Sequence, residues 1–376
     1  MKSLLGWGLS FMTHLCPVFE LLLSAEWGGF FCIENHMQGF VLPYPLLFIS
    51  IHLYNTKGDL SIMKHLKKLT LLLTLTMLVS VFAGCSGQQP AGQSGTASKG
   101  TSITVTDMTG KEITLEEPAT RIVALTASDC EILYAIGAGD TLVGRGEYCD
   151  YPAEVLDVPA VQSGADTNLE QIISLEPQVL LMSTMAQTEE QIAALEAAGI
   201  KVVVSDAQDI EGVYTAVELI GALMGKDAEA AAVVENMKST FETISSQATG
   251  DGTKSVYFEV SPLEYGLWAA GKNTFMHEIA EMLGLKNAFE DVEGWGEISE
   301  EQIIERNPDY IVTITMYFGE GPTPEEEIAG RAGWENITAV KNGAILNLQN
   351  NELSRPAPRL ADGAQMMFDF VYGSAE

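Results

Sequence analysis

Residues 227–248 read DAEAAAVVENMKSTFETISSQA, and this stretch decides the fold. Its apolar residues recur at intervals of three and four, at Ala230, Val233, Val234, Met237, Phe241 and Ile244. That period predicts a helix, with Asp227 as its N-cap and Gly250 and Gly252 as its stop. At about 1.5 Å per residue the helix spans on the order of 30 Å, the width of a small domain. The alternative is an ordinary surface helix.

Similar sequence patterns flank this helix on both sides. Residues 168–181 read NLEQIISLEPQVLL, and residues 299–312 read SEEQIIERNPDYIV. Glu170 aligns with Glu301 without a gap, and the other matches follow at the same offset. Each copy has the pattern of a short helix, a proline-marked stop and an apolar strand. A repeat at this distance indicates two similar lobes; chance similarity between two amphipathic units is the alternative.

Apolar strands alternate with helical stretches on both sides of the central helix. Before it, we expect strands at 103–107, 112–115, 121–125, 141–144 and 201–204, and helices at 131–136 and 189–198. After it, we expect strands at 255–260, 310–315 and 344–348, and helices at 275–283, 300–306 and about 359–372. This alternation predicts parallel sheets covered on both faces. The expected fold is α/β, with two Rossmann-like lobes joined by one long helix and a ligand cleft between the lobes.

The amino-terminal part has the pattern of an export segment. Residues 1–62 are rich in Trp, Phe, Leu and His without a clean period, and we interpret them as lying upstream of the true start at Met63. Residues 63–84 combine a basic cluster, an apolar run and small residues, as a signal peptide does. A short membrane anchor is the alternative. We assign 85–101 to Cys85 and a flexible tether, 102–225 to the first lobe, 226–250 to the bridging helix and 251–376 to the second lobe.

Composition and motifs narrow the functional classes. The net charge of -31 argues against nucleic acid as a partner, because binding phosphates needs clustered Lys and Arg. We find no Walker A loop, G-x-S-x-G elbow, HExxH or CxxC. After Cys85 the chain has one histidine, His277, which we interpret as structural, so neither a bound metal nor a cofactor is expected. Cys130 and Cys149 either pair or stay free, because their spacing decides nothing.

One short segment before residue 86 and several stretches after residue 102 resemble sequences of known protein classes. Residues 81–85, VFAGC, resemble the bacterial lipoprotein lipobox, in which Cys85 becomes the lipidated first residue. Over 103–372 the chain resembles the solute-binding proteins of ABC importers for metal chelates: ferric siderophores, haem and corrinoids. The stretches that carry this resemblance are RIVAL at 121–125, EYCDYP at 147–152, NLE at 168–170, EP at 176–177, Trp295 with SEE at 299–301, NPD at 307–309 and RPAPR at 355–359.

The resemblance implies a function and partners. It implies a monomeric binding protein rather than an enzyme, anchored through its lipid to the extracytoplasmic face of the cell membrane. It would capture a small-molecule chelate and deliver it to a permease dimer with its ATPase. A secreted α/β hydrolase or chelatase is the competing class, and it would need a nucleophile with a base nearby. A structural surface lipoprotein is the third class.

The resemblance assigns a docking role to Glu170 and Glu301. In similar proteins one glutamate on each lobe meets arginines of the two permease subunits. The alternative is local, because Asn168 and Ser299 have the character of N-caps and the glutamines three residues later would complete capping boxes. The two carboxylates would then only favour the helix dipoles.

The ligand site rests on aromatic residues and one arginine. Tyr148 and Trp295 match residues that contact ligand in similar proteins, and Trp268 is a further aromatic candidate. Each of the three has lobe packing as its alternative. Arg355, held extended by the following proline, is expected to meet a ligand carboxylate or phosphate.

The chain departs from the cobalamin-binding members at two positions. Gly164 and Ser183 stand where those members have further tryptophans. The identity of the chelate therefore stays open among a siderophore, haem and another corrinoid.

Overall fold

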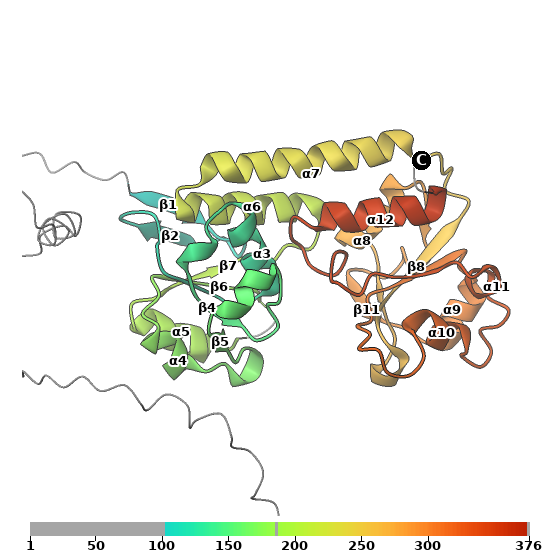
Figure 1. Cartoon of the computed structure of the whole chain (residues 1–376), viewed down its shortest axis with the longest axis horizontal. Coiled ribbons are helices and arrows are strands. Elements are labelled where there is room, and N and C mark those ends of the chain that lie inside the picture. Colours follow the sequence, from blue (N-terminus) through green and yellow to red (C-terminus); the bar gives the residue numbers. More distant parts are fainter. Residues whose placement is uncertain (1–101, 185–186, 374–376) are drawn as a thin grey trace, which may run out of the picture. The chain divides into compact units, whose positions relative to one another are not determined.

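The computed structural model describes residues 102–184 and 187–373, which belong to one compact unit of the chain, Gln93–Glu376. The predicted segments 1–62, 63–84 and 85–101, including Cys85, lie outside the described residues. Two lobes of sheet and helix make up the described part, and α7 (Asp227–Gln247) extends along both of them (Figure 1). The predicted α/β class with two lobes and one long joining helix is confirmed.

The first lobe is built on a five-stranded parallel sheet in the order β5-β4-β3-β6-β7. Its strands are β3 (Ile122–Ala124), β4 (Leu142–Gly146), β5 (Ala160–Val161), β6 (Val179–Met182) and β7 (Lys201–Val204). Its helices are α3 (Ala127–Ala135), α4 (Leu169–Ser174), α5 (Glu189–Ala197) and α6 (Ile210–Met224). An antiparallel hairpin of β1 (Ile103–Thr106) and β2 (Glu112–Leu115) precedes this sheet. Parallel neighbours need crossover connections: α3 lies on the one from β3 to β4, and α5 on the one from β6 to β7.

The second lobe has a six-stranded mixed sheet in the order β11-β9-β8-β12-β13, with β10 also paired to β8. Its strands are β8 (Ser255–Ser261), β9 (Trp268–Ala270), β10 (Lys286–Asn287), β11 (Trp295–Glu297), β12 (Tyr310–Thr313) and β13 (Ile345–Asn347). Its helices are α8 (Phe275–Met282), α9 (Glu300–Arg306), α10 (Pro324–Ala329), α11 (Thr338–Asn342) and α12 (Leu360–Tyr372). β9 runs antiparallel to both β8 and β11, so this sheet departs from the expected parallel pattern.

The two sheets share a common core topology. In the first lobe β6 lies between β3 and β7, and in the second β12 lies between β8 and β13, all parallel. Helix α4 precedes β6 and helix α9 precedes β12, as the repeat in the sequence predicts. The two aligned segments therefore occupy equivalent places in the two sheets.

Helix α7 packs against α6 in the first lobe and against α8 and α12 in the second. Its buried residues are Ala230, Val234, Met237, Phe241 and Ile244, which are members of the predicted apolar stripe. The prediction of Asp227 as N-cap is wrong: the cap position is Lys226, and no side chain caps it, because α7 follows α6 after a left-handed turn at Gly225.

Three apolar clusters bury the sheets on both faces. One cluster runs from the first lobe through α7 into the second lobe, and it includes Ile132, Phe241 and Phe258. The outer face of the first sheet is covered by a second cluster, and that of the second sheet by a third. Covered faces explain why the strands are continuously apolar. Within the described ranges, no helix has both the length and the apolarity needed to cross a bilayer.

Candidate functional site

A cavity of about 330 Å³ lies between the two lobes. The first lobe contributes Asp150 and Tyr151, which follow β4, and the second contributes Met316, residues 349–352 and Arg359. These segments follow parallel strands, and loops at the carboxyl ends of such strands are the usual ligand sites of α/β sheets. The predicted cleft between the lobes is therefore present as a cavity with walls from both.

A larger cavity of about 450 Å³ adjoins it within the second lobe, and Met316 lines both. The larger cavity lies beyond the ends of β8 and β12, between the turn η4 (Leu263–Tyr265), residues 315–322 and α10. Its wall is partly apolar, with Leu263, Tyr317 and Phe318, and the Phe318 side chain is almost fully exposed. A concave site with aromatic and aliphatic walls suits a large ligand of limited polarity.

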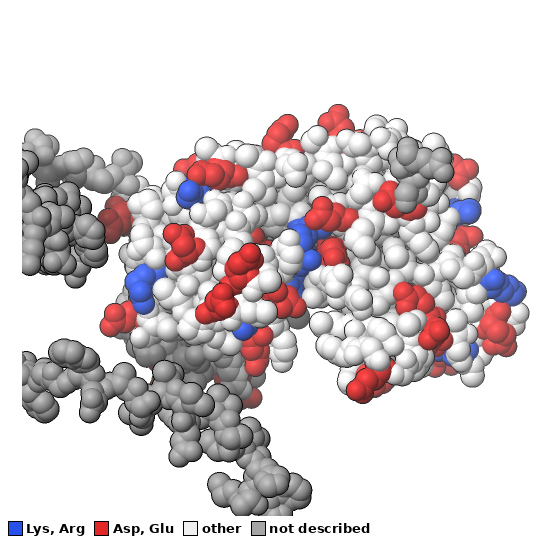
Figure 2. Space-filling view, viewed as in Figure 1, with Lys and Arg blue, Asp and Glu red and all other residues white. Residues whose placement is uncertain are grey.

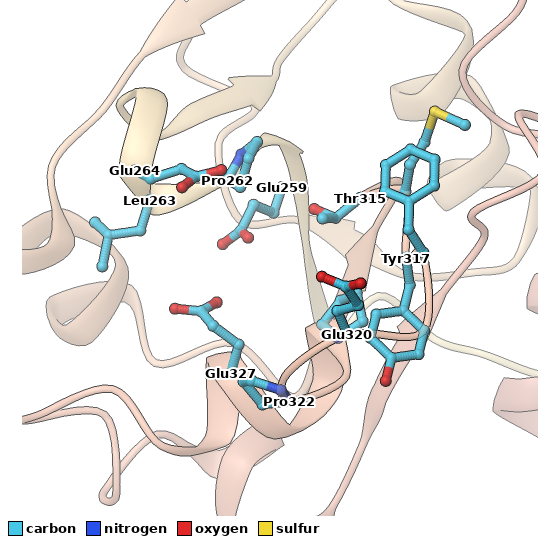
Figure 3. A pocket seen from close by; sticks show the side chains of 12 residues that line it. Glu259, Pro262, Leu263, Glu264, Thr315, Tyr317, Glu320, Pro322 and Glu327 are labelled. Carbon is cyan, nitrogen blue, oxygen red and sulfur yellow. The ribbon is translucent and has the colours of Figure 1, made fainter. Parts of the chain in front are cut away.

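Carboxylates give the larger cavity its electrostatic character. Glu259, Glu264, Glu320 and Glu327 line it, and in Figure 3 the carboxylates of Glu259, Glu320 and Glu327 point toward the same space. No Lys or Arg is among the described residues that line it. On the face drawn in Figure 2 acidic side chains also predominate over basic ones. This cavity is therefore suited to a neutral or cationic ligand rather than to an anionic one.

The buried Arg331 lies behind this wall and is fully engaged. Its guanidinium pairs with Glu259 through distances of 2.6 and 2.9 Å and with Glu327 at 2.6 Å. Burial alone would lower the pKa of Arg331, but the hydrogen bonds to these two glutamates outweigh burial and raise that pKa. Because its donors are occupied by two carboxylates, Arg331 stiffens the wall and leaves the cavity acidic.

Tyr148 follows β4 two residues before Asp150 and has 75% of its surface exposed, but it is not among the residues that line either cavity, so its contact with a ligand stays a prediction. The loop that carries it is held by Arg145, a residue that the sequence did not single out. The Arg145 Nη1 donates to the carbonyl oxygens of Gly146 and Cys149 at 3.1 and 3.0 Å, and Nε donates to that of Val158 at 3.2 Å. A charged donor that satisfies several carbonyl groups fixes a loop that would otherwise be mobile.

Arg355 crosses from the second lobe to the first. Its Nη1 lies 3.0 Å from Glu131 Oε1 and 2.6 Å from Asp150 Oδ1, and its Nη2 donates to the Tyr148 carbonyl at 3.2 Å. Arg359 converges on the same buried carboxylate, with its Nη2 at 2.6 Å from Glu131 Oε1, and stacks over the ring of Tyr151 at 3.8 Å. The structure thus gives Arg355 partners in the protein, and its contact with a ligand stays a prediction.

The two tryptophans of the prediction lie in different places. Trp268 begins β9 beside Ser261, the last residue of β8, and is partly exposed at the same strand end as the larger cavity. Trp295 packs on Phe275 with ring centroids 5.4 Å apart, and its Nε1 donates to Gln208 Oε1 of the first lobe at 2.9 Å. Trp295 therefore lies at a seam between the lobes, and ligand contact stays a prediction for both residues.

Asp129 is a buried carboxyl in the first turn of α3, next to the end of β7. It accepts hydrogen bonds from the hydroxyl groups of Ser205 and Thr126. Burial raises the pKa of Asp129 to about 6, the two hydroxyl groups oppose that rise, and Asp206 adds to it. The group can therefore carry a proton under mildly acidic conditions.

Glu170 and Glu301 occupy equivalent exposed positions in the first turns of α4 and α9. Ser299 forms a complete capping box with Gln302. The predicted second box is wrong in part: Asn168 caps α4, but the Gln171 side chain donates to the Ala160 carbonyl instead. Neither Glu170 nor Glu301 makes a hydrogen bond or ion pair within the described part of the chain, so both carboxylates are available to a partner.

The two cysteines and the histidine singled out in the sequence lie in no metal-binding cluster of the described residues. Cys130 and Cys149 are both buried and form no disulfide; a hydrogen bond that the Cys130 thiol donates to Cys149, together with burial, raises the pKa of Cys130. His277 Nε2 lies 3.6 Å from Glu281 Oε1, and its Nδ1 has no hydrogen-bond partner among the described residues. Among residues 102–184 and 187–373, no group of three or more His, Cys, Asp or Glu side chains gathers as a metal site. The absence of a cofactor stays a prediction.

Comparison with known proteins identifies the family. A family model described as periplasmic binding protein matches residues 122–352. The uncharacterized ABC transporter substrate-binding lipoprotein YvrC of Bacillus subtilis is 33% identical over 308 residues, which cover 79% of this chain and 95% of that protein. The cobalamin-binding protein of Halobacterium salinarum is 27% identical over 301 residues, covering 77% of this chain and 80% of that protein.

A solved structure agrees with these relatives. A possible iron-binding (periplasmic solute-binding) protein from Staphylococcus epidermidis superposes with a TM-score of 0.57 at 32% identity, over 68% of this chain and 100% of that chain. The two lobes, the bridging α7 and the cleft at the strand ends agree with the same class. The chain therefore belongs to the periplasmic binding protein family.

Proposed function

We propose that this chain is the extracytoplasmic substrate-binding component of an ABC importer and that it captures a metal chelate in the cleft between its lobes. The observation that carries the proposal is the pair of adjoining cavities at the strand ends, one of them lined by both lobes. The similarity to a cobalamin-binding protein and to a possible iron-binding protein supports a chelate as the ligand. The chain acts by binding and not by catalysis.

The charge of the site favours one group of chelates. The larger cavity is lined by four glutamates, and the arginine behind them is already paired. An anionic chelate brought into this cavity would face like charges at short range, where the dielectric constant is low. A neutral or cationic ferric siderophore or corrinoid is therefore the preferred ligand, ahead of haem with its two carboxylates.

Titration of tryptophan fluorescence on the chain from Ser86 onward tests this proposal. The probes are cobalamin, a ferric hydroxamate, an anionic ferric catecholate and haem, and calorimetry gives the stoichiometry. We expect saturable binding of the hydroxamate or the corrinoid at one site, at least ten times tighter than that of the catecholate. Tightest binding of the catecholate would contradict the charge argument, and binding of none would contradict chelate capture.

We propose further that Glu170 and Glu301 dock the protein onto the two subunits of a permease dimer, with its ATPase on the far side of the membrane. One unpaired carboxylate at the same place on each lobe suits a partner with two equivalent cationic sites. A lipid on Cys85 would hold the protein, as a monomer, at the cell membrane beside this partner.

Replacing both carboxylates tests the docking role. E170Q/E301Q should abolish transport in reconstituted vesicles while leaving chelate affinity unchanged, because both residues lie outside the two cavities. Replacement of Glu235, an exposed glutamate in the middle of α7, is the matched control and should leave transport unchanged. Normal transport by E170Q/E301Q would contradict docking through these carboxylates.

A further inference from the structure

Helices α4 and α9 each carry two consecutive isoleucines, of which the first is buried and the second is exposed. Ile172 and Ile303 are fully buried at 0% exposure and hold their helices on the lobes. Ile173 and Ile304 are turned outward, with 41% and 39% of their surface exposed. The two lobes thus expose the same residue type at almost the same level.

The sequence repeat relates these exposed residues to each other. Ile173 follows Glu170 by three positions, and Ile304 follows Glu301 by three positions. Residues three apart lie on the same side of a helix, so each lobe presents a carboxylate and an aliphatic side chain next to each other. Because α4 and α9 precede the equivalent strands β6 and β12, the two pairs occupy equivalent places in the two lobes.

We propose that Ile173 and Ile304 are the apolar contacts of a two-part docking surface that fits a partner built from two like subunits. This inference rests on the proposed function, in which that partner is the permease dimer. Each subunit would supply a cationic side chain for the glutamate and an apolar depression for the isoleucine. We call the four residues Glu170, Ile173, Glu301 and Ile304 the docking surface.

The aliphatic side chains have a physical role beside the carboxylates. An ion pair that stays in water contributes little, because the dielectric constant is high and salt screens it. An isoleucine that packs against the partner excludes water from the neighbouring pair and so strengthens the attraction. Glu170 and Glu301 would set orientation and the salt dependence of association, while the isoleucines would slow dissociation.

Matched variants separate this proposal from general surface effects. I173S/I304S changes the two docking isoleucines, and L156S is the control, because Leu156 is 56% exposed on the first lobe but lies outside the docking surface. Each is compared with the unmodified chain for chelate binding by fluorescence and for binding to its permease–ATPase complex reconstituted in phospholipid vesicles. The salt concentration is varied in the second measurement.

The expected result for I173S/I304S is unchanged chelate affinity with permease binding weakened at least tenfold at every salt concentration. The slope of affinity against salt should stay native, whereas E170Q/E301Q should flatten it. L156S should behave as the unmodified chain. Each single variant, I173S or I304S, should lose about half of the effect on a logarithmic scale, because the two lobes contribute equally.

Three outcomes would overturn the inference. If I173S/I304S bound the permease as tightly as the unmodified chain, the two isoleucines would have no role in docking, and the proposed function would stay intact. A dimer of the unmodified chain that I173S/I304S converts to monomers would assign these residues to self-association. Failure of the unmodified chain itself to bind both chelates and permease would overturn the proposed function, and the docking surface with it.

Discussion

Glu131 is the residue on which the two lobes converge. It is buried in α3 of the first lobe and receives Arg355 at 3.0 Å and Arg359 at 2.6 Å from the second. Burial lowers the pKa of both arginines, but hydrogen bonds to acidic partners, Asp150 and Glu131 for Arg355 and Glu131 for Arg359, outweigh it, so both pKa values are raised. One carboxylate thus neutralises much of the charge that two guanidinium groups bring into the seam.

Removing this carboxylate should be strongly destabilising. E131Q would leave Arg355 and Arg359 close together without their shared counter-charge, and breaking a buried pair in this way costs about 3–5 kcal/mol. Urea unfolding followed by circular dichroism measures the free energy of unfolding. Replacement of Lys226, which forms an exposed pair with Glu229, is the control and should have little effect. Equal stabilities for the two variants would contradict the role of Glu131.

The raised pKa of the buried Asp129 carboxyl group should make the stability of the protein depend on pH. Its folded pKa of about 6 lies above its ordinary value of 3.8, so the folded state binds the proton more tightly than the unfolded chain does. Its contribution to stability is therefore fully present below about pH 4 and is lost as the pH rises through 6, by about 3 kcal/mol at most. The D129N variant stays neutral at every pH and should lose this dependence.

Thermal unfolding at pH 4.5 and pH 7.5 checks the prediction for Asp129. The D129N variant should gain stability over the unmodified chain at pH 7.5 and show little difference at pH 4.5. D206N is the comparison: because the Asp206 charge adds to the rise in the pKa of Asp129, its removal should make the pH dependence smaller without abolishing it. A D129N chain less stable than the native one at pH 7.5 would show that the buried carboxylate is ionised and favourable.

At the scale of elements, α7 acts as part of the core of both lobes. Its apolar stripe lies in the cluster that continues from one lobe to the other. Helix α6 runs next to it and was not anticipated, although Asp209 as a capping residue and Gly225 as a left-handed stop mark both ends of α6 in the sequence. Helix α6 belongs to the first lobe and packs along α7 there, so it anchors the bridging helix on that lobe.

Truncating the buried face of α7 should destabilise the protein. F241A would remove a large side chain that is 5% exposed, and such changes cost about 3–5 kcal/mol. E235A, on the exposed face of the same helix, should leave the unfolding midpoint unchanged. Loss of both lobes in one cooperative transition is expected, because the cluster is shared. Separate transitions for the two lobes in F241A would contradict a common core.

A close approach of two glycines marks the end of the bridge. The predicted stop at Gly250 and Gly252 falls beyond the helix, which ends at Gln247 with Ala248 as its C-cap. A Cβ on Gly250 would lie 2.5 Å from the Gly284 carbonyl oxygen and 2.7 Å from the Tyr372 hydroxyl. Gly250 is thus required by tight packing on the second lobe rather than by helix termination.

At the scale of the whole described unit, several contacts restrain the two lobes. Besides the Glu131 ion pairs, the Phe275 amide donates to the Gln208 carbonyl at 2.8 Å and the Ile210 amide to Glu278 Oε2 at 2.7 Å. These contacts lie where α8 meets the segment before α6. Ligand capture is therefore expected to proceed with small movements of the lobes.

Small-angle X-ray scattering measures this restraint. Saturation with the tightest-binding chelate should change the radius of gyration by no more than about 1 Å, because the backbone of a pre-organised site moves little on binding. The comparison is made on the same chain from Ser86 onward, with and without ligand. A contraction of several ångströms would show that the seam opens and closes, and that the described contacts belong to one of two states.

Local patterns were sufficient for most elements of the fold. Helix α7, the repeated α4–β6 and α9–β12 units and the Ser299 capping box follow from periodicity and from residues within one turn of each other. The antiparallel β9 and β11 did not follow, because strand direction depends on pairing between distant segments. The positions of Glu170 and Glu301 were predictable because the repeat itself relates the two lobes.

By itself, the sequence determined the fold class, the long helix, the two-fold repeat and the acidic character of the chain. Only the tertiary structure decided which charges remain free. Arg355 contacts Glu131, which is 224 positions away along the chain, and Trp295 donates a hydrogen bond to Gln208 across the seam. Neither partner could be predicted from a local sequence pattern. The physical reason is that a side chain's partners depend on which surfaces meet when the lobes pack, whereas helix and strand patterns depend on near neighbours.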